Sequence, residues 1–241
     1  MRLGVYINSA LKLRDKGSPT HPDPVALSVM CELAGAEVIL IGFSPERGLT
    51  SERDIRRIQE TVNCDLYLVI PSRDDLIDLV ARLNPNGVIL VDSSWDGIAP
   101  PQPIQAAFEA EHVRNIGSLY STSGIPAMAL VDPQLPNLKA LARASLNGVV
   151  LHTERYCNAD SDEEAQSALE ELDNAALAAN KFGFPICYSG GLCYNNVGSI
   201  SALPFGDEIF IGRRLINRAL MVGINTAVRD IVQIIYRNSS K

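Results

Sequence analysis

The sequence predicts a closed barrel of eight parallel strands, each followed by a helix: the (β/α)8, or TIM-barrel, fold. Short apolar runs alternate eight times with longer segments that have helical spacing. The length of 241 residues is also typical of one such barrel. No break in composition divides the chain, so we expect a single domain over residues 1–241.

The main competing fold is an open doubly wound sheet. In that fold the first strand leads into a glycine-rich phosphate loop. Here the first apolar run leads into Asn8-Ser-Ala-Leu, and the chain contains no GxGxxG motif. The barrel is therefore preferred, with strands expected at 2–7, 37–41, 66–70, 87–91, 126–131, 148–151, 185–188 and 208–211.

Helices are predicted between these strands. Asp23 is a suitable N-cap with Pro24 in the first turn, and Thr50 or Ser51 caps the second helix. The expected helices are 23–33, 50–62, 72–83, 102–116, 138–146, 162–180 and 215–237. The loop at 92–101 is the least regular connection, and Trp95 within it either covers a ligand or anchors the loop on the barrel rim.

Composition excludes several classes of function. A net charge of −7 argues against nucleic-acid binding. No apolar run is long enough for a membrane span, and the first is too short for a signal peptide, so we expect a cytoplasmic protein without a membrane partner. Five cysteines without a CxxC pair and three scattered histidines predict reduced thiols, no metal site and no cofactor.

Two glycine-containing turns predict an anion site. The stretch from Cys187 to Cys193 contains Gly190 and Gly191, and the second turn reads Ile211-Gly-Arg-Arg. They follow the last two predicted strands, where barrels commonly bind phosphate with backbone N–H groups at a helix start. Arg213 and Arg214 add positive charge there. The alternative is that both are tight turns that merely require glycine.

Stretches along nearly the whole chain carry a resemblance to a known family. They are Leu3-Gly-Val, Leu13-Arg, Pro22-Asp-Pro-Val, Gly35-Ala, Arg53-Asp, Leu151-His-Thr with Tyr156, Gly191-Leu with Tyr194 and Asn196-Val, 200–204, Ile211-Gly, Arg218-Ala and Gly223. In these stretches the chain resembles the pyridoxine 5'-phosphate synthase family, vitamin B6 barrels that condense aminoacetone phosphate with deoxyxylulose phosphate. The resemblance implies a transferase-like barrel that assembles as a homo-oligomer.

The chain departs from this family at the positions that the resemblance assigns to substrate binding and proton transfer. Tyr6-Ile-Asn-Ser stands where the family has Asn-Ile-Asp-His. The family's catalytic histidines and glutamates correspond to Gly42, Val69, Val150 and Gly190, and its sugar-phosphate contacts to Gly17, Ser44 and Leu49. Valine and glycine exchange no protons, so the condensation is expected to be lost or altered.

The same resemblance implies that the phosphate-binding half of the site is retained. Gly191 and Gly212 match family phosphate binders, Arg213 replaces a histidine, and Thr153 offers a hydroxyl. The expected partner is one small phosphorylated molecule. The pocket around it is predicted to contain Tyr6, Asn8, Ser9, Ser44 and Tyr188.

No catalytic residue is assigned from the sequence. Cys187 or Cys193 could be a nucleophile, and Asp92, Asp132 or Glu154 a new base. His152 ends a strand and could also be a new acid–base group, but the resemblance implies a structural role, which is preferred. A divergent enzyme, a non-catalytic binder of a phosphometabolite such as a B6 vitamer, and an oligomeric scaffold remain open.

Overall fold

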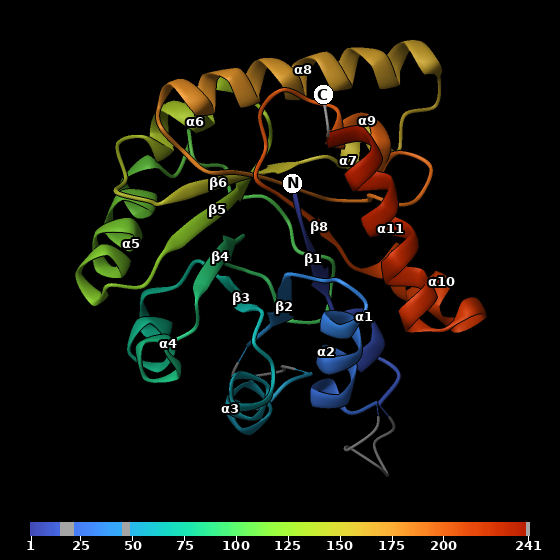
Figure 1. The fold of residues 1–241 in the computed structure, drawn as a ribbon. Coiled ribbons are helices and arrows are strands. Elements are labelled where there is room, and N and C mark those ends of the chain that lie inside the picture. Colours follow the sequence, from blue (N-terminus) through green and yellow to red (C-terminus); the bar gives the residue numbers. More distant parts are fainter. Residues whose placement is uncertain (15–21, 45–48, 240–241) are drawn as a thin grey trace.

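Eight parallel strands close into a barrel in the computed structural model, which describes residues 1–14, 22–44 and 49–239 (Figure 1). Each strand pairs in parallel with the next in the sequence, and β8 pairs with β1. The predicted barrel is therefore confirmed. The strands are β1 Arg2–Tyr6, β2 Val38–Gly42, β3 Asp65–Pro71, β4 Gly87–Val91, β5 Ala127–Val131, β6 Gly148–His152, β7 Ile186–Ser189 and β8 Glu208–Ile211.

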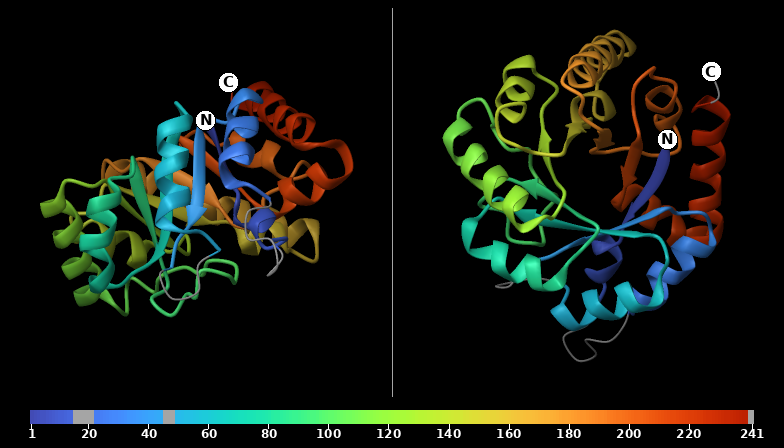
Figure 2. Two further views of the ribbon diagram at one scale, coloured as in Figure 1. Left: turned by 90° about the horizontal axis from the view of Figure 1, so that it is seen from below. Right: turned by 60° about the vertical axis from the view of Figure 1, so that its left-hand side comes forward.

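The helices surround the strands on the outside of the barrel (Figure 2). Asp23 and Ser51 cap α2 and α3 with their side chains, and Asp54 completes a capping box with Ser51. The helices are α1 Asn8–Leu11, α2 Pro24–Leu33, α3 Glu52–Thr61, α4 Ile77–Leu83 after the 3-10 turn η1 Asp74–Leu76, α5 Ala110–Ser123, α6 Leu135–Leu141, α7 Glu154–Cys157, α8 Asp162–Lys181, α9 Val197–Ser201, α10 Arg213–Val222 and α11 Ile224–Ser239.

The helix expected at 102–116 is displaced, because α5 covers Ala110–Ser123 instead. Prolines at 100, 101 and 103 remove backbone donors from the preceding stretch. That stretch instead bonds to the barrel edge, where the Ile104 amide donates to the Leu130 carbonyl oxygen at 2.8 Å. The expected helix 138–146 also lies earlier, as α6 at Leu135–Leu141.

The closing helix predicted at 215–237 is two helices, α10 and α11. Gly223 between them has φ of 80°, a conformation that ends a helix. The short helices α1, α7 and α9 were not predicted, because four or five residues are too few to show a helical period.

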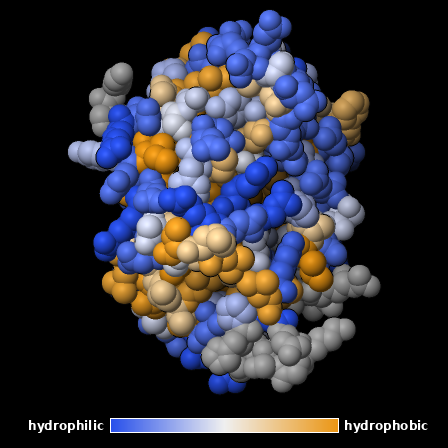
Figure 3. Space-filling model, turned by 90° about the vertical axis from the view of Figure 1, so that its right-hand side faces the viewer, coloured by the Kyte–Doolittle hydropathy of each residue, from blue (hydrophilic) through white to orange (hydrophobic). Residues whose placement is uncertain are grey.

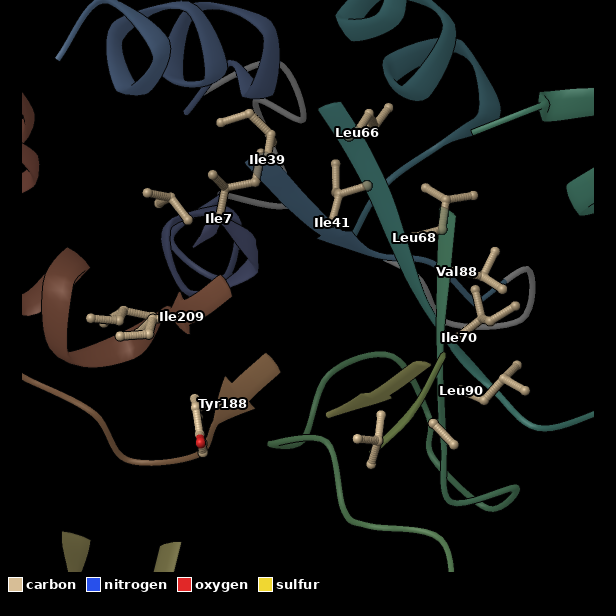
Figure 4. Close-up of a cluster of buried hydrophobic side chains, with 14 of the residues drawn as sticks. Ile7, Ile39, Ile41, Leu66, Leu68, Ile70, Val88, Leu90, Tyr188 and Ile209 are labelled. Carbon is tan, nitrogen blue, oxygen red and sulfur yellow. The ribbon is translucent and has the colours of Figure 1, made fainter. Parts of the chain in front are cut away.

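Strand side chains alternate between two apolar layers. One layer fills the barrel interior and includes Val69, Val150, Cys187 and Phe210. The other lies between the strands and the helices, and Figure 4 shows part of it, with Ile209 and Tyr188 among the labelled side chains. Cys187 and Tyr188 are adjacent and therefore point to opposite layers.

The amino-terminal end of the barrel is closed by polar side chains around Glu208. This carboxylate lies 3.1 Å from the Arg2 guanidinium and accepts a hydrogen bond from the Tyr67 hydroxyl at 3.3 Å. Burial is the largest influence and raises the pKa of Glu208. The opposite, carboxyl-terminal end of the strands is the end at which barrels bind ligands.

Candidate functional site

A cavity of about 130 Å³ opens at the carboxyl ends of the strands. Its floor is apolar and includes Leu40, Val69, Ile89, Val150 and Phe210 from the barrel interior. Its rim is formed by α1, the segment 98–101, and the ends of β6, β7 and β8. The positions where the family resemblance places two glutamates, Val69 and Val150, therefore contribute hydrocarbon to the floor.

The amino-terminus of α10 borders the cavity. Gly212 is the N-cap residue, and no side chain caps this helix. The first amides of a helix have no intrahelical acceptor, so they remain available to an anion. Arg213 and Arg214 also line the cavity, and neither forms an ion pair with another residue that the structure describes. This end of α10 combines amide donors, the positive end of the helix dipole and two cations.

The glycine turn after β7 forms the adjacent wall. Gly190 and Gly191 have φ of 120° and 74°, which favour glycine. A Cβ on Gly190 would lie 2.6 Å from His152 Cδ2, and one on Gly191 would lie 2.7 Å from Cys157 Cβ. The turn therefore requires glycine for its geometry and its packing, and both glycines also line the cavity.

Tyr6, Asn8 and Ser9, three of the residues expected around a ligand, all line the cavity. Asn8 is buried, and its side chain accepts a hydrogen bond from the Gly42 amide at 2.7 Å and donates to the Gly42 carbonyl at 3.3 Å. The Asn8 amide thus joins the start of α1 to the end of β2. Desolvation raises the pKa of the Tyr6 hydroxyl, which stays neutral at physiological pH.

The space beside Gly42 is filled. A Cβ there would lie 2.4 Å from Asn8 Nδ2, 2.5 Å from the Tyr6 hydroxyl and 2.7 Å from Trp95 Cη2. Trp95 is 6% exposed, packs in the interior layer and donates from Nε1 to the Ala99 carbonyl at 2.7 Å. The tryptophan therefore anchors the 92–101 loop in the barrel mouth, which corresponds to the second of its two predicted roles.

Three predicted site residues lie away from the cavity. Tyr188 is fully buried in the outer layer, and its hydroxyl donates to the Phe205 carbonyl at 2.6 Å, so the prediction that it lines the pocket is corrected by the alternation of β7. Thr153 is fully buried and donates to the Gly190 carbonyl at 2.5 Å. Ser44 is buried outside the lining residues, and Gly17 lies outside the described residues.

Lys12 was missed by the sequence analysis, although it lines the cavity together with Arg213 and Arg214. Leu49 is partly buried, and its carbonyl accepts a hydrogen bond from Arg14 at 2.9 Å. Placing Lys12 from sequence would have required prediction of the short helix α1, because Lys12 is the C-cap residue of that helix.

His152 lies between two carboxylates at the cavity wall. Its Nδ1 is 3.1 Å from Asp132 Oδ1, and its Nε2 is 3.4 Å from Glu154 Oε2. The hydrogen bond with His152 is the largest influence on Asp132 and lowers the pKa of that carboxyl. Asp132 and Glu154 lie at opposite edges of the ring. Among the described residues, no three or more His, Cys, Asp or Glu side chains are grouped so that they could bind a metal ion.

The cysteines and Asp92 have other roles. Cys187 is buried in the barrel interior, where desolvation raises the pKa of its thiol, so it is not an activated nucleophile. The Cys193 amide donates to Asn196 Oδ1 at 2.7 Å, and Cys193 does not line the cavity. Asp92 accepts from the Ser94 amide at 2.9 Å and shapes the loop after β4.

Solved structures share the fold at low sequence identity. Phosphoribosyl anthranilate isomerase from Thermus thermophilus superposes with a TM-score of 0.59, at 13% identity over 98% of this chain and 99% of that one. The Amycolatopsis orientalis BexX/CysO complex gives a TM-score of 0.65, at 14% identity over 99% and 89% of the two chains. The fold is therefore that of a (β/α)8 barrel, with a cavity at the carboxyl ends of its strands.

Sequence comparison identifies the family. The family described as pyridoxal phosphate biosynthesis protein PdxJ matches residues 3–237. Pyridoxine 5'-phosphate synthase from Synechococcus sp. (strain JA-2-3B'a(2-13)) is 32% identical over 233 residues, covering 97% of this chain and 98% of that protein. The protein of the same name from Syntrophotalea carbinolica is 29% identical over the same shares. The chain belongs to the PdxJ family of vitamin B6 biosynthesis proteins.

The helices were also compared with the requirements of a bilayer. Across residues 1–14, 22–44 and 49–239, none of them combines the length and apolar character needed for a membrane span.

Proposed function

We propose that this PdxJ-family barrel binds one small phosphorylated ligand, and that the family's condensation is lost or altered in it. The observation that carries the proposal is the uncapped start of α10, where Gly212, Arg213 and Arg214 border the cavity. Gly191 and Lys12 border the same space. The phosphate would accept from the α10 amides and pair with the cations, while its organic part lies on the apolar floor.

The Thr153 hydroxyl is not part of this proposed phosphate site. Its donor is committed to the Gly190 carbonyl, so Thr153 supports the glycine turn. A second sugar-phosphate pocket is also unsupported, because Trp95, Tyr6 and Asn8 fill the space beside Gly42. One bound phosphate ester is consistent with the remaining volume.

The names of the relatives suggest the chemistry of the ligand. Two relatives at 32% and 29% identity are named pyridoxine 5'-phosphate synthase. We infer that the ligand is a phosphate ester of B6 metabolism, either a B6 vitamer or one of the precursors that the family resemblance implies. Because Val69, Val150 and Gly190 line the cavity without a titratable group, the family's positions for proton transfer contribute nothing to the reaction.

Calorimetry with pyridoxine 5'-phosphate, aminoacetone phosphate and deoxyxylulose phosphate tests this function, with unphosphorylated pyridoxine as the matched control. We expect micromolar affinity for at least one ester, and at least about 100-fold weaker affinity for pyridoxine when its phosphate is the compound bound. Equal affinity for pyridoxine and its phosphate, or no heat with any ester, would contradict a phosphate site.

We also propose that the chain self-assembles. Exposed apolar side chains at the end of α10 support this, since Leu220 and Met221 are 66% and 84% exposed. Figure 3 shows apolar residues gathered on the face that carries α10 and α11. Contiguous apolar surface of this kind is typical of interfaces.

Two alternative functions make different predictions for the binding experiment. A non-catalytic carrier of a phosphometabolite would bind the ester without turnover. A scaffold would not bind it.

A further inference from the structure

We propose that His152 is the acid–base catalytic residue of the cavity, exchanging a proton through Nε2 with a phosphorylated carbonyl compound while Asp132 holds the ring. This proposal rests on the proposed function in one respect: the phosphate site at the start of α10 must hold the substrate. It assigns a reacting group to a cavity whose floor offers none, and it differs from the structural role that the sequence suggested for His152.

Asp132 fixes the orientation and the tautomer of the ring. An ionised carboxylate only accepts hydrogen bonds, and Asp132 Oδ1 lies 3.1 Å from His152 Nδ1. The lowered pKa of Asp132 keeps it ionised at neutral pH. Nδ1 therefore carries the proton, and Nε2 is the nitrogen that can take up or release one. Asp132 follows β5 and His152 ends β6, so two neighbouring strands hold the pair rigidly.

Glycine at position 190 leaves space beside the Nε2 edge of the ring. A Cβ at this position would lie 3.0 Å from Nε2 and 2.6 Å from Cδ2, and would cover that edge. His152 itself is only 9% exposed, yet it lines the cavity together with Ser189 and Gly190. A ligand in the cavity thus meets a ring that is otherwise shielded from solvent.

A second carboxylate lies beside the Nε2 edge of the ring. Glu154 Oε2 lies 3.4 Å from His152 Nε2, and its side chain is 43% exposed at the cavity rim. This separation is longer than a good hydrogen bond, so the contact leaves Nε2 available to a ligand. Among the residues that the structure describes, the other charged groups that line the cavity are Lys12, Arg213 and Arg214.

These groups together support proton abstraction next to a carbonyl. The Nε2 lone pair takes a proton from the carbon beside the carbonyl, and the C–H electron pair moves to form an enolate. The cations of the rim stabilise the negative charge on the enolate oxygen. Return of a proton from the imidazolium to the same carbon restores the carbonyl compound and completes an exchange with solvent, without an oxidant, reductant or second substrate.

The other histidines do not offer this arrangement. His112 Nε2 lies 2.8 Å from the Ser72 carbonyl oxygen, which requires that nitrogen to donate. His112 is also absent from the cavity lining, and His21 lies outside the described residues. His112→Gln is therefore a matched control for the loss of one imidazole.

The test is hydrogen–deuterium exchange of aminoacetone phosphate and dihydroxyacetone phosphate in D2O, followed by proton NMR. Wild type should exchange the C–H protons beside the carbonyl of at least one probe. His152→Gln and His152→Ala should slow this exchange by about 10²–10⁴-fold. Added imidazole should restore part of the rate in His152→Ala, which a purely structural histidine would not allow, and His112→Gln should match wild type.

Two outcomes overturn the proposal: no exchange by wild type of a probe that calorimetry shows to bind, or equal rates in wild type and His152→Gln. If neither probe binds, the proposed phosphate site is contradicted for these compounds. A second measurement then still decides the role of His152. Diethyl pyrocarbonate should then carbethoxylate His152 in the free wild-type protein, as located by mass spectrometry. An unmodified His152 under conditions that modify an exposed histidine peptide would overturn its assignment as the accessible base.

Discussion

Replacing Arg213 by alanine is expected to weaken binding of the phosphate ester by about 10- to 100-fold. The guanidinium lines the cavity at the first position of α10, and it has no competing ion pair among the described residues. A hydrogen bond to a charged group contributes about 1.5–3 kcal/mol, which corresponds to this range of affinity. Calorimetric titration of the variant with the ester that wild type binds measures the effect.

Arg229→Ala is the matched control for Arg213→Ala, because it removes the same charge from an exposed position on α11. The control should bind within about twofold of wild type, since separation and screening reduce its electrostatic effect on the ligand. Equal affinities in all three proteins would show that the α10 amides alone hold the phosphate or that the ligand binds elsewhere. Similar losses in both variants would indicate a general charge effect.

Gly117→Ala is expected to lower the free energy of unfolding by about 3 kcal/mol or more. A Cβ at Gly117 in α5 would lie 1.7 Å from the backbone oxygen of Ala144, which precedes β6. A backbone carbonyl cannot rotate away as a side chain can, so the helix must move off the barrel and lose packing. Urea unfolding followed by the fluorescence of Trp95, the only tryptophan, measures the change.

Gly198→Ala is the control for the stability measurement. Gly198 is also helical, but the nearest atom to its Cβ would be Asn238 Nδ2 at 3.4 Å, an ordinary contact at the end of a side chain. Alanine has the higher helix propensity, so this variant should stay within about 1 kcal/mol of wild type. A Gly117→Ala protein as stable as the control would mean that α5 does not contact Ala144 as described.

Much of the barrel could be predicted from local sequence because its strands are short apolar runs bounded by turns. The errors occur where local pattern and tertiary packing conflict. Apolar spacing suggested a helix from residue 102, but proline lacks a donor and Ile104 bonds to Leu130 at the barrel edge. Likewise, the single left-handed residue Gly223 divides a continuous amphipathic pattern into α10 and α11.

The candidate site was predictable only in part. The glycine turn after β7 and the start of α10 were visible because two strands lead directly into them. Tyr188 was misplaced because a strand only four residues long does not show which of its faces points inward. The contact between Asp132 and His152 joins residues 20 apart in the sequence on neighbouring strands. Such a pairing depends on the barrel register, which local sequence does not contain.

The most direct test of the central claim is the backbone amide NMR spectrum during titration with pyridoxine 5'-phosphate, with unphosphorylated pyridoxine as the control. The account predicts that the phosphate ester shifts the amides of Gly191 and of residues 212–215 most strongly, and that pyridoxine does not. These amides lie at the glycine turn and at the uncapped start of α10. Shifts confined to other regions, such as the hollow between α6 and α8, would contradict a phosphate site at α10.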